Sequence, residues 1–157
     1  MNDLIIRKAN INDLDSIINL LYQVQNVHSD LRPDLFISGS RKYTNLELEA
    51  ILNDSLKPIF VAELNNNVVG YAFTIITIPI SHTLAPIKTL YIDDLCVDKD
   101  YRGNHIGLSL YNYTLDYAKK INCYNVTLNV WADNEDALRF YKKIGLKIQK
   151  IGMERIL

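Results

Sequence analysis

Two periods of apolar residues run along the chain, and the change from one period to the other marks its elements. In the first third, apolar residues recur at three- and four-residue intervals: Leu14, Ile17, Ile18, Leu21 and Val24. This spacing predicts an amphipathic helix over about 11–27. Asn10 is placed to cap that helix, with Asp13 three residues later. Residues 4–8, before the cap, are predicted to form a short strand.

Strand and helix patterns alternate in the rest of the chain. Residues 28–43 mix Pro, Gly, Ser and charges, which indicates a long loop of the kind that often carries function. The further elements expected are a helix at about 44–54, strands at 58–64 and 68–78, a strand at 87–97, a helix at 104–120, a strand at 124–131, a helix at 134–144 and a last strand at 146–151. This order, β-α-α-β-β-β-α-β-α-β, predicts an α/β fold of the α+β type, with a mixed, mostly antiparallel central sheet flanked by helices.

Length, charge and cysteine content narrow the function classes. The 157 residues suit one domain that spans 1–157, and a net charge of −1 argues against a protein that binds nucleic acid or membranes through bulk charge. No apolar stretch reaches about 18 residues and no signal peptide is visible, so no membrane association is expected. Cys96 and Cys123 fit a reduced, cytoplasmic setting. The three histidines lie far apart and no spacing matches a metal site, so no metal is expected.

The segment Asp98–Gly107 joins an expected strand to an expected helix and is the first candidate for chemistry. Unpaired N–H groups at a helix start bind phosphate, and Arg102 adds positive charge beside them. Gly103 allows a close turn, and Gly107 lets the helix approach a ligand or the sheet. The segment has neither the ending of a P-loop nor the three glycines of a dinucleotide fingerprint. By itself it is equally well explained as a plain strand-to-helix turn.

Two further candidates are the adjacent carboxylates Asp93 and Asp94 and the phenol of Tyr141. Neighbours in a strand point to opposite faces, so one carboxylate is expected to face the interior or a cleft, where a raised pKa would suit a general base. Tyr141 lies seven residues after Asn134, two helical turns along the same face. Taken singly, each candidate has a simpler explanation. Of the two aspartates, one is solvated and the other is hydrogen-bonded to a turn, and Tyr141 is a core residue.

In this order and spacing, the three segments resemble the GCN5-related N-acetyltransferase family over about residues 90–146. In that family an Arg/Gln-x-x-Gly-x-Gly/Ala segment wraps the pyrophosphate of acetyl-CoA. The resemblance places six residues on it: Arg102, Gly103, Asn104, His105, Ile106 and Gly107. The strand before it lends backbone groups to the pantetheine arm and thioester, which implies Leu95, Cys96 and Val97.

The family's Asn-x-x-Ala-x-x-Phe-Tyr pattern is also intact, from Asn134 to Tyr141. It implies that Asn134 lies beside the cofactor arm and that Tyr141, beside the sulfur, protonates the departing thiolate. The strand YIDDLCV resembles the Tyr-Leu-Glu-Asp strand of the polyamine acetyltransferases, which implies that Asp93 assists deprotonation of the amine. Asp93 is one methylene shorter than that glutamate, which favours a bridging water. Cys96 as an acyl-carrying nucleophile is the less favoured alternative, since direct transfer needs no protein nucleophile.

One residue departs from the family pattern, because His105 stands at the first motif glycine. A positive φ at that position would cost a histidine some stability, whereas a helical φ would not. The donors to phosphate are backbone N–H groups, so cofactor binding is expected to survive the change.

The expected function is an acetyl-CoA-dependent N-acetyltransferase that moves an acetyl group directly to a primary amine of a small molecule, polyamine-like among the options, or of a peptide. The alternative is a catalytically silent acetyl-CoA-binding regulatory or interaction domain. Arg32, Asp34 and Arg41 of the 28–43 loop are candidates for contact with the acceptor. An exposed last strand near residues 152–157 can pair with another chain, so a homodimer is one expectation.

Overall fold

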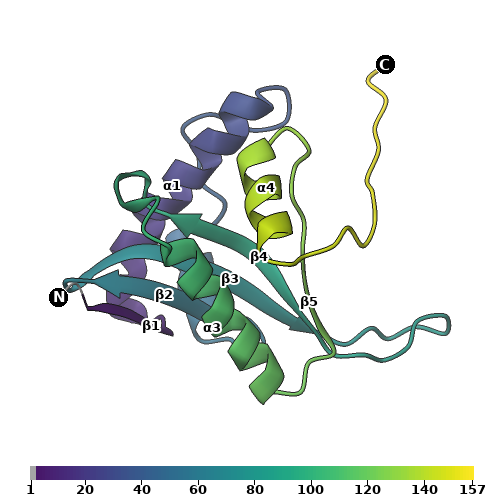
Figure 1. Ribbon diagram of the computed structural model, residues 1–157. Helices are drawn as coiled ribbons and strands as arrows, with labels where there is room; N and C mark the ends of the chain where they lie inside the picture. The colour runs from purple at the N-terminus through teal and green to yellow at the C-terminus, as the bar shows by residue number, and fades with distance from the viewer. Residues whose placement is uncertain (1–2) are drawn as a thin grey trace.

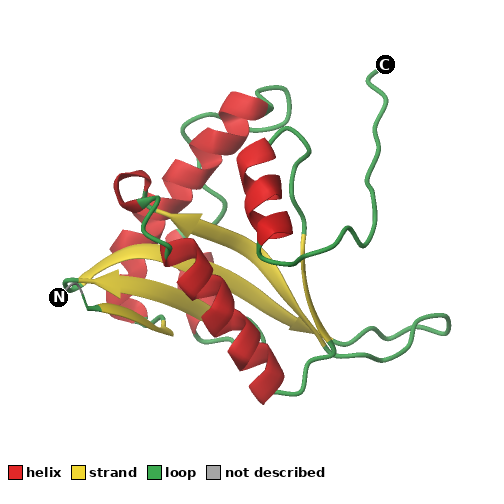
Figure 2. Cartoon of the chain, in the orientation of Figure 1, coloured by secondary structure: helices red, strands yellow, loops and turns green. Residues whose placement is uncertain are grey.

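The computed structural model describes residues 3–157 and shows a five-stranded sheet with helices on both faces (Figure 1, Figure 2). The strands lie in space in the order of the sequence: β1 (Leu4–Lys8), β2 (Ile59–Leu64), β3 (Asn67–Thr77), β4 (Thr89–Val97) and β5 (Asn125–Leu128). Neighbours among the first four pair antiparallel, and β5 runs parallel to β4. The predicted fold class, a mixed and mostly antiparallel sheet flanked by helices, is confirmed.

The α-helices of the described chain are α1 (Leu14–Leu31), α2 (Asn45–Leu52), α3 (Ile106–Lys120) and α4 (Glu135–Lys143). Short 3-10 turns at Ile11–Asp13 and Lys99–Tyr101 precede α1 and α3. As predicted, Asn10 caps the first turn, and the Asp13 carboxylate accepts a reciprocal hydrogen bond from the Asn10 N–H at 2.8 Å. Within residues 3–157, no helix has both the length and the apolar character needed to cross a bilayer.

The first helix ends about one turn later than the predicted range of 11–27, and its predicted first residues, Ile11–Asp13, form the 3-10 turn. It continues to Leu31 and stops immediately before Arg32 and Pro33. The residue before a proline disfavours the helical conformation, which explains where α1 ends. The loop predicted at 28–43 therefore begins at Arg32, and His28 lies in the last turn of α1.

The core lies on both faces of the sheet, because β2 and β3 are buried on both sides. Ile59 and Val61 pack on the face covered by α1 and α2, together with Tyr71 and Phe73 of β3. The alternate residues of β2, which include Phe60, pack on the opposite face against α3. Burial on both faces explains why these strands read as continuous apolar runs rather than as alternating patterns.

The strand predicted at 146–151 is wrong. Residues 147–157 follow α4 as an extended, exposed segment that belongs to no strand of the described chain (Figure 1). An apolar pattern favours a strand, but a strand forms only where a neighbouring backbone supplies a ladder of hydrogen bonds. No such neighbour lies beside this segment within residues 3–157.

Candidate active site

The hydrogen-bond ladder between β4 and β5 stops halfway along β4. The two strands pair only from Thr89 to Ile92, and β5 ends at Leu128 rather than at the predicted 131. Beyond Ile92, β4 continues to Val97 and pairs with β3 alone. Within residues 3–157, the other edge of Leu95–Val97 has no strand beside it. This open edge consists of the three residues that the sequence predicts beside a thioester.

The turn after β4 presents an uncapped helix start next to the open edge. His105 is the N-cap residue of α3, and its side chain makes no capping hydrogen bond. The Ser109 N–H donates to the His105 carbonyl at 3.0 Å and forms the first backbone hydrogen bond of α3. The preceding N–H groups at the start of α3 lie at the positive end of the helix dipole, and no acidic side chain lies in the first turn. This end of α3 therefore favours an anion.

The backbone of this turn reaches the left-handed region twice. Gly103 has φ +80° and His105 has φ +58°. The sequence left two conformations open for His105, a helical φ and a positive φ, and the structure has the positive φ, which costs more. Histidine tolerates a positive φ better than a branched residue would. Left-handed residues within a turn direct neighbouring N–H groups to one side, a concave arrangement that suits phosphate.

Contacts from two sides hold the turn in place. The Arg102 guanidinium folds back along it, where Nε donates to the Val97 carbonyl at 3.1 Å. Gln23 of α1 donates through Nε2 to the Asp98 carboxylate at 3.2 Å and accepts from the Lys99 N–H at 3.1 Å. The turn is thus tied to α1 as well as to β4.

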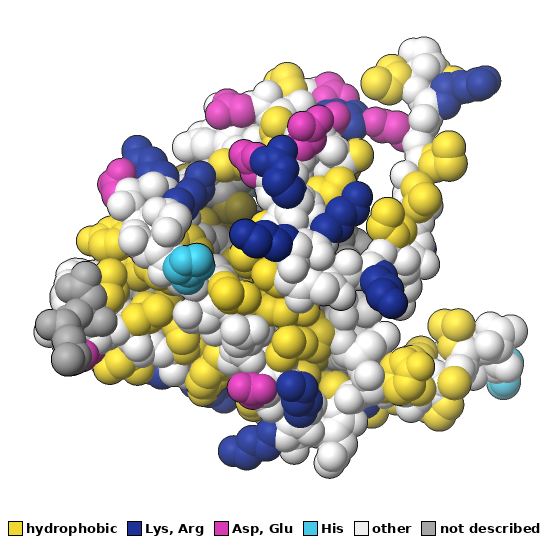
Figure 3. Space-filling model, viewed as in Figure 1, with side chains coloured by type: hydrophobic (Ala, Val, Ile, Leu, Met, Phe, Trp, Pro, Cys, Tyr) yellow, Lys and Arg dark blue, Asp and Glu magenta, His cyan; other side chains and the backbone are white. Residues whose placement is uncertain are grey.

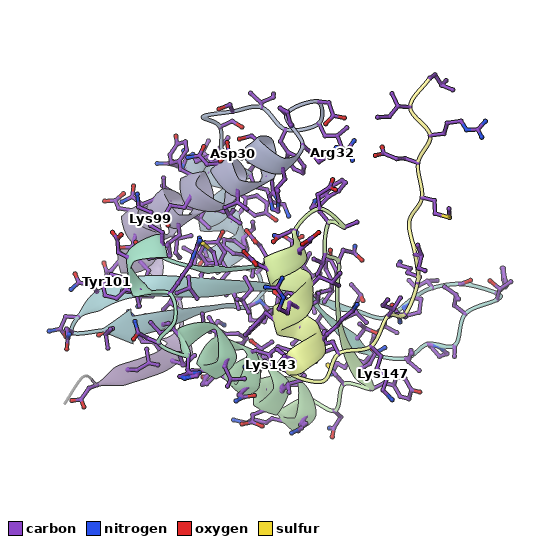
Figure 4. All side chains as sticks on the ribbon, turned by 45° about the horizontal axis from the view of Figure 1, so that its top comes forward. Asp30, Arg32, Lys99, Tyr101, Lys143 and Lys147 are labelled. Carbon is purple, nitrogen blue, oxygen red and sulfur yellow. The ribbon has the colours of Figure 1, made fainter. Side chains whose placement is uncertain are left out.

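Helix α4 packs against the same end of α3. A Cβ placed on Gly107 would lie 3.6 Å from the Phe140 ring and 3.6 Å from the Val97 side chain, so Gly107 marks a close approach of α3, α4 and β4. Asn134 caps α4, since its Oδ1 accepts from the Ala137 N–H at 3.2 Å. Figure 4 shows α4 with Lys143 at its end, and Lys99 and Tyr101 on the turn before α3.

Two carboxylates lie together on one face of the sheet because β4 carries a bulge. Phe73 pairs with Asp94 and Thr74 pairs with Ile92, which leaves Asp93 as the extra residue. The expectation that Asp93 and Asp94 point to opposite faces is therefore wrong. An inserted residue shifts the strand alternation by one, so both side chains reach the face covered by α1 and α2.

Each carboxylate accepts a hydrogen bond from a tyrosine of the same aromatic cluster. The Tyr43 hydroxyl donates to Asp93 Oδ2 and the Tyr71 hydroxyl donates to Asp94 Oδ2, both at 2.6 Å. Both tyrosine rings pack on Phe73. A cavity of about 50 Å³ opens beside Asp93, Tyr43 and Phe73. Sequence reasoning did not identify these two tyrosines, because Tyr71 looks like a core residue of a strand and Tyr43 falls in the predicted 28–43 loop.

A primary ammonium group of the chain itself already lies at this site. Lys42 Nζ is 2.7 Å from Asp93 Oδ2, and the Asp93 side chain is only 13% exposed. Lys42 belongs to the loop after α1, whereas Asp93 belongs to β4. The arrangement shows that Asp93 can hold a primary ammonium in a half-enclosed position.

The protonation of the neighbouring groups is set mainly by burial. Burial raises the pKa of Asp94 to about 6, although the Tyr71 hydroxyl and the Lys42 ammonium act in the opposite direction. Burial and then the Asp94 charge raise the pKa of Tyr141 above its usual value, so its phenol stays protonated at neutral pH. Burial also raises the pKa of Cys96 to about 12, which disfavours the Cys96 thiolate that an acyl-carrying nucleophile would need.

The loop after α1 contacts the segment between β5 and α4 through aromatic rings. The Phe36 ring stacks on His28 at 4.9 Å and meets the Trp131 ring edge-on at 5.3 Å, which joins α1 to the segment between β5 and α4. The three loop residues predicted to contact an acceptor are paired within the chain. Arg32 bonds both Asp34 and Glu154, and Arg41 donates to Asn45.

Basic side chains gather around the start of α3 and on α4. Figure 3 shows a hollow on this face, with Lys and Arg side chains along its rims and hydrophobic side chains on its floor. Arg139, Lys142 and Lys143 of α4 are exposed, as is Arg102 of the turn. The chain has a net charge of −1, so this local excess of positive charge depends on the fold. Within residues 3–157, no three His, Cys, Asp or Glu side chains come together as metal ligands would.

Comparisons with known proteins agree with this geometry. The model of the family described as "Acetyltransferase (GNAT) family" matches residues 24–146. An uncharacterized N-acetyltransferase from Methanocaldococcus jannaschii is 26% identical over 146 residues, which cover 93% of this chain and 62% of the relative. The chain therefore spans less than two thirds of the length of that relative.

Solved structures show the same fold. A tetramutant of the BH1408 protein from Bacillus halodurans is 30% identical with a TM-score of 0.92, and the alignment covers 98% of this chain and 99% of that chain. An aminoglycoside N-acetyltransferase in complex with CoA shares the fold at a TM-score of 0.74 and 14% identity, with 99% of this chain and 96% of that chain covered.

Proposed function

Because this chain belongs to the GNAT acetyltransferase family, we propose that it is an N-acetyltransferase that moves the acetyl group of acetyl-CoA directly to a primary amine of a small cationic molecule or a peptide. The observation that carries the proposal is the open edge of Leu95–Val97, which lies between an uncapped helix start and a pair of carboxylates. One side suits a phosphate-bearing donor and the other suits a cationic acceptor.

The donor is held chiefly by backbone groups in this proposal. The N–H groups at the start of α3 and the turn 102–107 bind the pyrophosphate, with Arg102 adding charge. The open edge of Leu95–Val97 hydrogen-bonds the pantetheine arm, and Asn134 lies beside it at the start of α4. Acetyl-CoA supplies the acetyl group as an activated thioester. The basic side chains of α4 favour the remaining phosphate of this anionic donor.

The acceptor is proposed to be cationic because Asp93 already holds an ammonium group. A substrate amine would replace Lys42 Nζ at Asp93 Oδ2. A primary amine with a pKa near 10.4 is neutral in only about one part in a thousand at pH 7.4, so removal of its proton is worth up to roughly a thousandfold in rate. Asp93 takes that proton, directly or through water, and Asp94 stands next to it as a second acceptor whose pKa of about 6 lies closer to neutrality.

Tyr141 is proposed to donate the proton that the departing thiolate needs. Its phenol is protonated at neutral pH, and it lies close enough to Asp94 for that charge to raise its pKa. The backbone N–H of Val97 is the proposed donor to the tetrahedral oxyanion. The N–H of Cys96, two residues before the Asp98 N–H that donates to the Val69 carbonyl, points to β3 instead. Free thiols at Cys96 and Cys123 are compatible with a cytoplasmic site of action, which the proposal includes.

The test is an acceptor screen that detects the thiol released from acetyl-CoA, run over polyamines, aminoglycosides, amino acids and peptides. Turnover with at least one amine is expected, with cationic amines preferred. Release of thiol from no acceptor, together with measurable binding of acetyl-CoA, would favour the alternative of a silent acetyl-CoA-binding domain.

The two carboxylates are distinguished by separate variants. We expect Asp93→Asn to lower kcat/KM most below about pH 8, with partial recovery at higher pH, where the amine is neutral without a base. The same profile for Asp94→Asn, and not for Asp93→Asn, would transfer the base role to Asp94. Asp116→Asn is the matched control, because Asp116 is an exposed carboxylate on α3.

A further inference from the structure

A lysine of the chain occupies the position at which the proposed acceptor amine would bind. Lys42 Nζ lies 2.7 Å from Asp93 Oδ2, and the Lys42 side chain is 43% exposed although that of Asp93 is only 13% exposed. Lys42 belongs to the loop between α1 and α2, which begins at Arg32, labelled in Figure 4. The side chain therefore presents its primary amine to Asp93 without being enclosed itself.

The residue next to Lys42 in the sequence anchors this amine. The Tyr43 hydroxyl donates to the same oxygen, Asp93 Oδ2, at 2.6 Å. The Tyr43 ring stacks on the Phe73 ring with centroids 5.4 Å apart, and Lys42 Nζ lies 5.4 Å from the Tyr43 centroid. Because Tyr43 is fixed by both its ring and its hydroxyl, the neighbouring amine is held at Asp93 by the fold of the loop.

The same amine lies near the proposed position of the thioester. Asp93 stands in β4 two residues before the open edge of Leu95–Val97, and two residues of a strand span about 7 Å. An ion-paired lysine elsewhere shows the contrast: Lys119 pairs with Asp116 at 3.6 Å on the surface of α3, where its side chain is 75% exposed. Of these two lysines, Lys42 alone combines a carboxylate partner with a place beside the open edge.

We propose, resting on the proposed function, that Lys42 is a modification site: in the absence of another amine, the chain transfers the acetyl group of acetyl-CoA to its own Lys42 Nζ. Asp93 takes one proton from the ammonium and passes it to water. The neutral nitrogen then attacks the thioester carbonyl, so that an N–C bond forms and the C–S bond breaks. The thiolate takes a proton from Tyr141, which recovers the second proton lost by the nitrogen through solvent. The products are N-acetyl-lysine, the CoA thiol and one released proton.

Incubation of the full chain with acetyl-CoA and no added amine tests the proposal. We expect one equivalent of thiol and one acetyl group per chain, located at Lys42 by peptide mass spectrometry, with a rate constant that does not depend on protein concentration. Lys42→Arg should lose this modification, because the guanidinium keeps the positive charge at Asp93 but does not give up its proton. Lys119→Arg is the matched control and should retain it, since Lys119 is an ion-paired lysine away from the site. Circular dichroism shows whether the variants remain folded.

Asp93→Asn separates catalysed transfer from spontaneous acetylation of exposed lysines. We expect this variant to acetylate Lys42 more slowly by about 10²-fold, with no change at exposed lysines, because only Lys42 has Asp93 as its base. Acetylation spread over exposed lysines, or a Lys42 rate that is unaffected by Asp93→Asn, would overturn the proposal. An unmodified Lys42 in a chain that acetylates an added amine would overturn this inference alone. Transfer to neither Lys42 nor any added amine would overturn the proposed function as well.

Discussion

One extra residue in β4 decides how the two carboxylates act together. Without the bulge at Asp93, only one of the two would reach the cluster of Tyr43, Tyr71 and Phe73. With it, one carboxylate holds an ammonium group, and the other lies half-buried beside it and accepts a hydrogen bond from the Tyr71 hydroxyl. At the scale of single residues, the consequence is a stability cost at Asp94.

Asp94→Asn is expected to stabilise the protein at neutral pH. Burial raises the pKa of Asp94 from 3.8 to about 6, so the folded state favours the protonated form. The associated stability is present below about pH 4 and is lost as the pH rises through 6, to a total of roughly 3 kcal/mol. The amide stays neutral, so the variant should melt at a higher temperature at pH 7.5, with the advantage fading towards pH 4. Equal melting temperatures at pH 7.5 would show that the carboxylate bears no such cost.

Tyr141→Phe is expected to leave folding and acetyl-CoA affinity nearly unchanged, because only a hydroxyl is lost from a packed ring. If the phenol protonates the leaving thiolate, kcat should fall by roughly 10²-fold. The loss should shrink with an acyl donor whose thiol has a lower pKa, since such a thiolate needs less protonation. Single-turnover kinetics with the two donors measures this. An equal loss with both donors would assign Tyr141 a packing role.

At the scale of elements, the start of α3 depends on two left-handed residues that differ in cost. His105→Gly is expected to raise the free energy of unfolding by up to about 1 kcal/mol and to retain acetyl-CoA binding, because glycine adopts a positive φ without strain. Gly103→Ala should have the opposite effect, of similar size, although a Cβ there would touch nothing within 4 Å. Chemical denaturation of both variants is the measurement. Loss of acetyl-CoA binding in His105→Gly would contradict the proposal that backbone N–H groups of this turn, and not the His105 side chain, bind the pyrophosphate.

At the scale of the whole molecule, the donor site joins elements that lie far apart in the sequence. The turn 98–107 is tied to α1 through Gln23 and packs against α4 through Gly107. A ligand that bridges these elements stabilises all of them together. At a concentration 100 times its Kd, acetyl-CoA should add about 2.7 kcal/mol to the stability of the fold, visible as a higher melting temperature. NAD and ATP are the controls and should shift it less. No shift with saturating acetyl-CoA would contradict the proposed donor.

Much of the architecture follows from local sequence. The apolar period predicted the strands β1 to β4 and the helices to within a few residues, apart from the end of α1, because amphipathic faces and capping residues act over neighbouring positions. The Asn10 cap is an example. The segments from Asp98 to Gly107 and from Asn134 to Tyr141 likewise carry their pattern in consecutive residues, so the sequence alone identified the family that the comparisons confirm.

Tertiary structure decided what depends on a neighbour. Whether Asp93 and Asp94 share a face is set by the register of β4 against β3, and residue types in β4 do not encode a bulge. The positive φ of His105 follows from how the turn meets α3. The tail shows the same principle, since its apolar residues have strand character but its backbone has no partner within residues 3–157. A sequence specifies local preferences, whereas a ladder of hydrogen bonds exists only between two segments that the fold brings side by side.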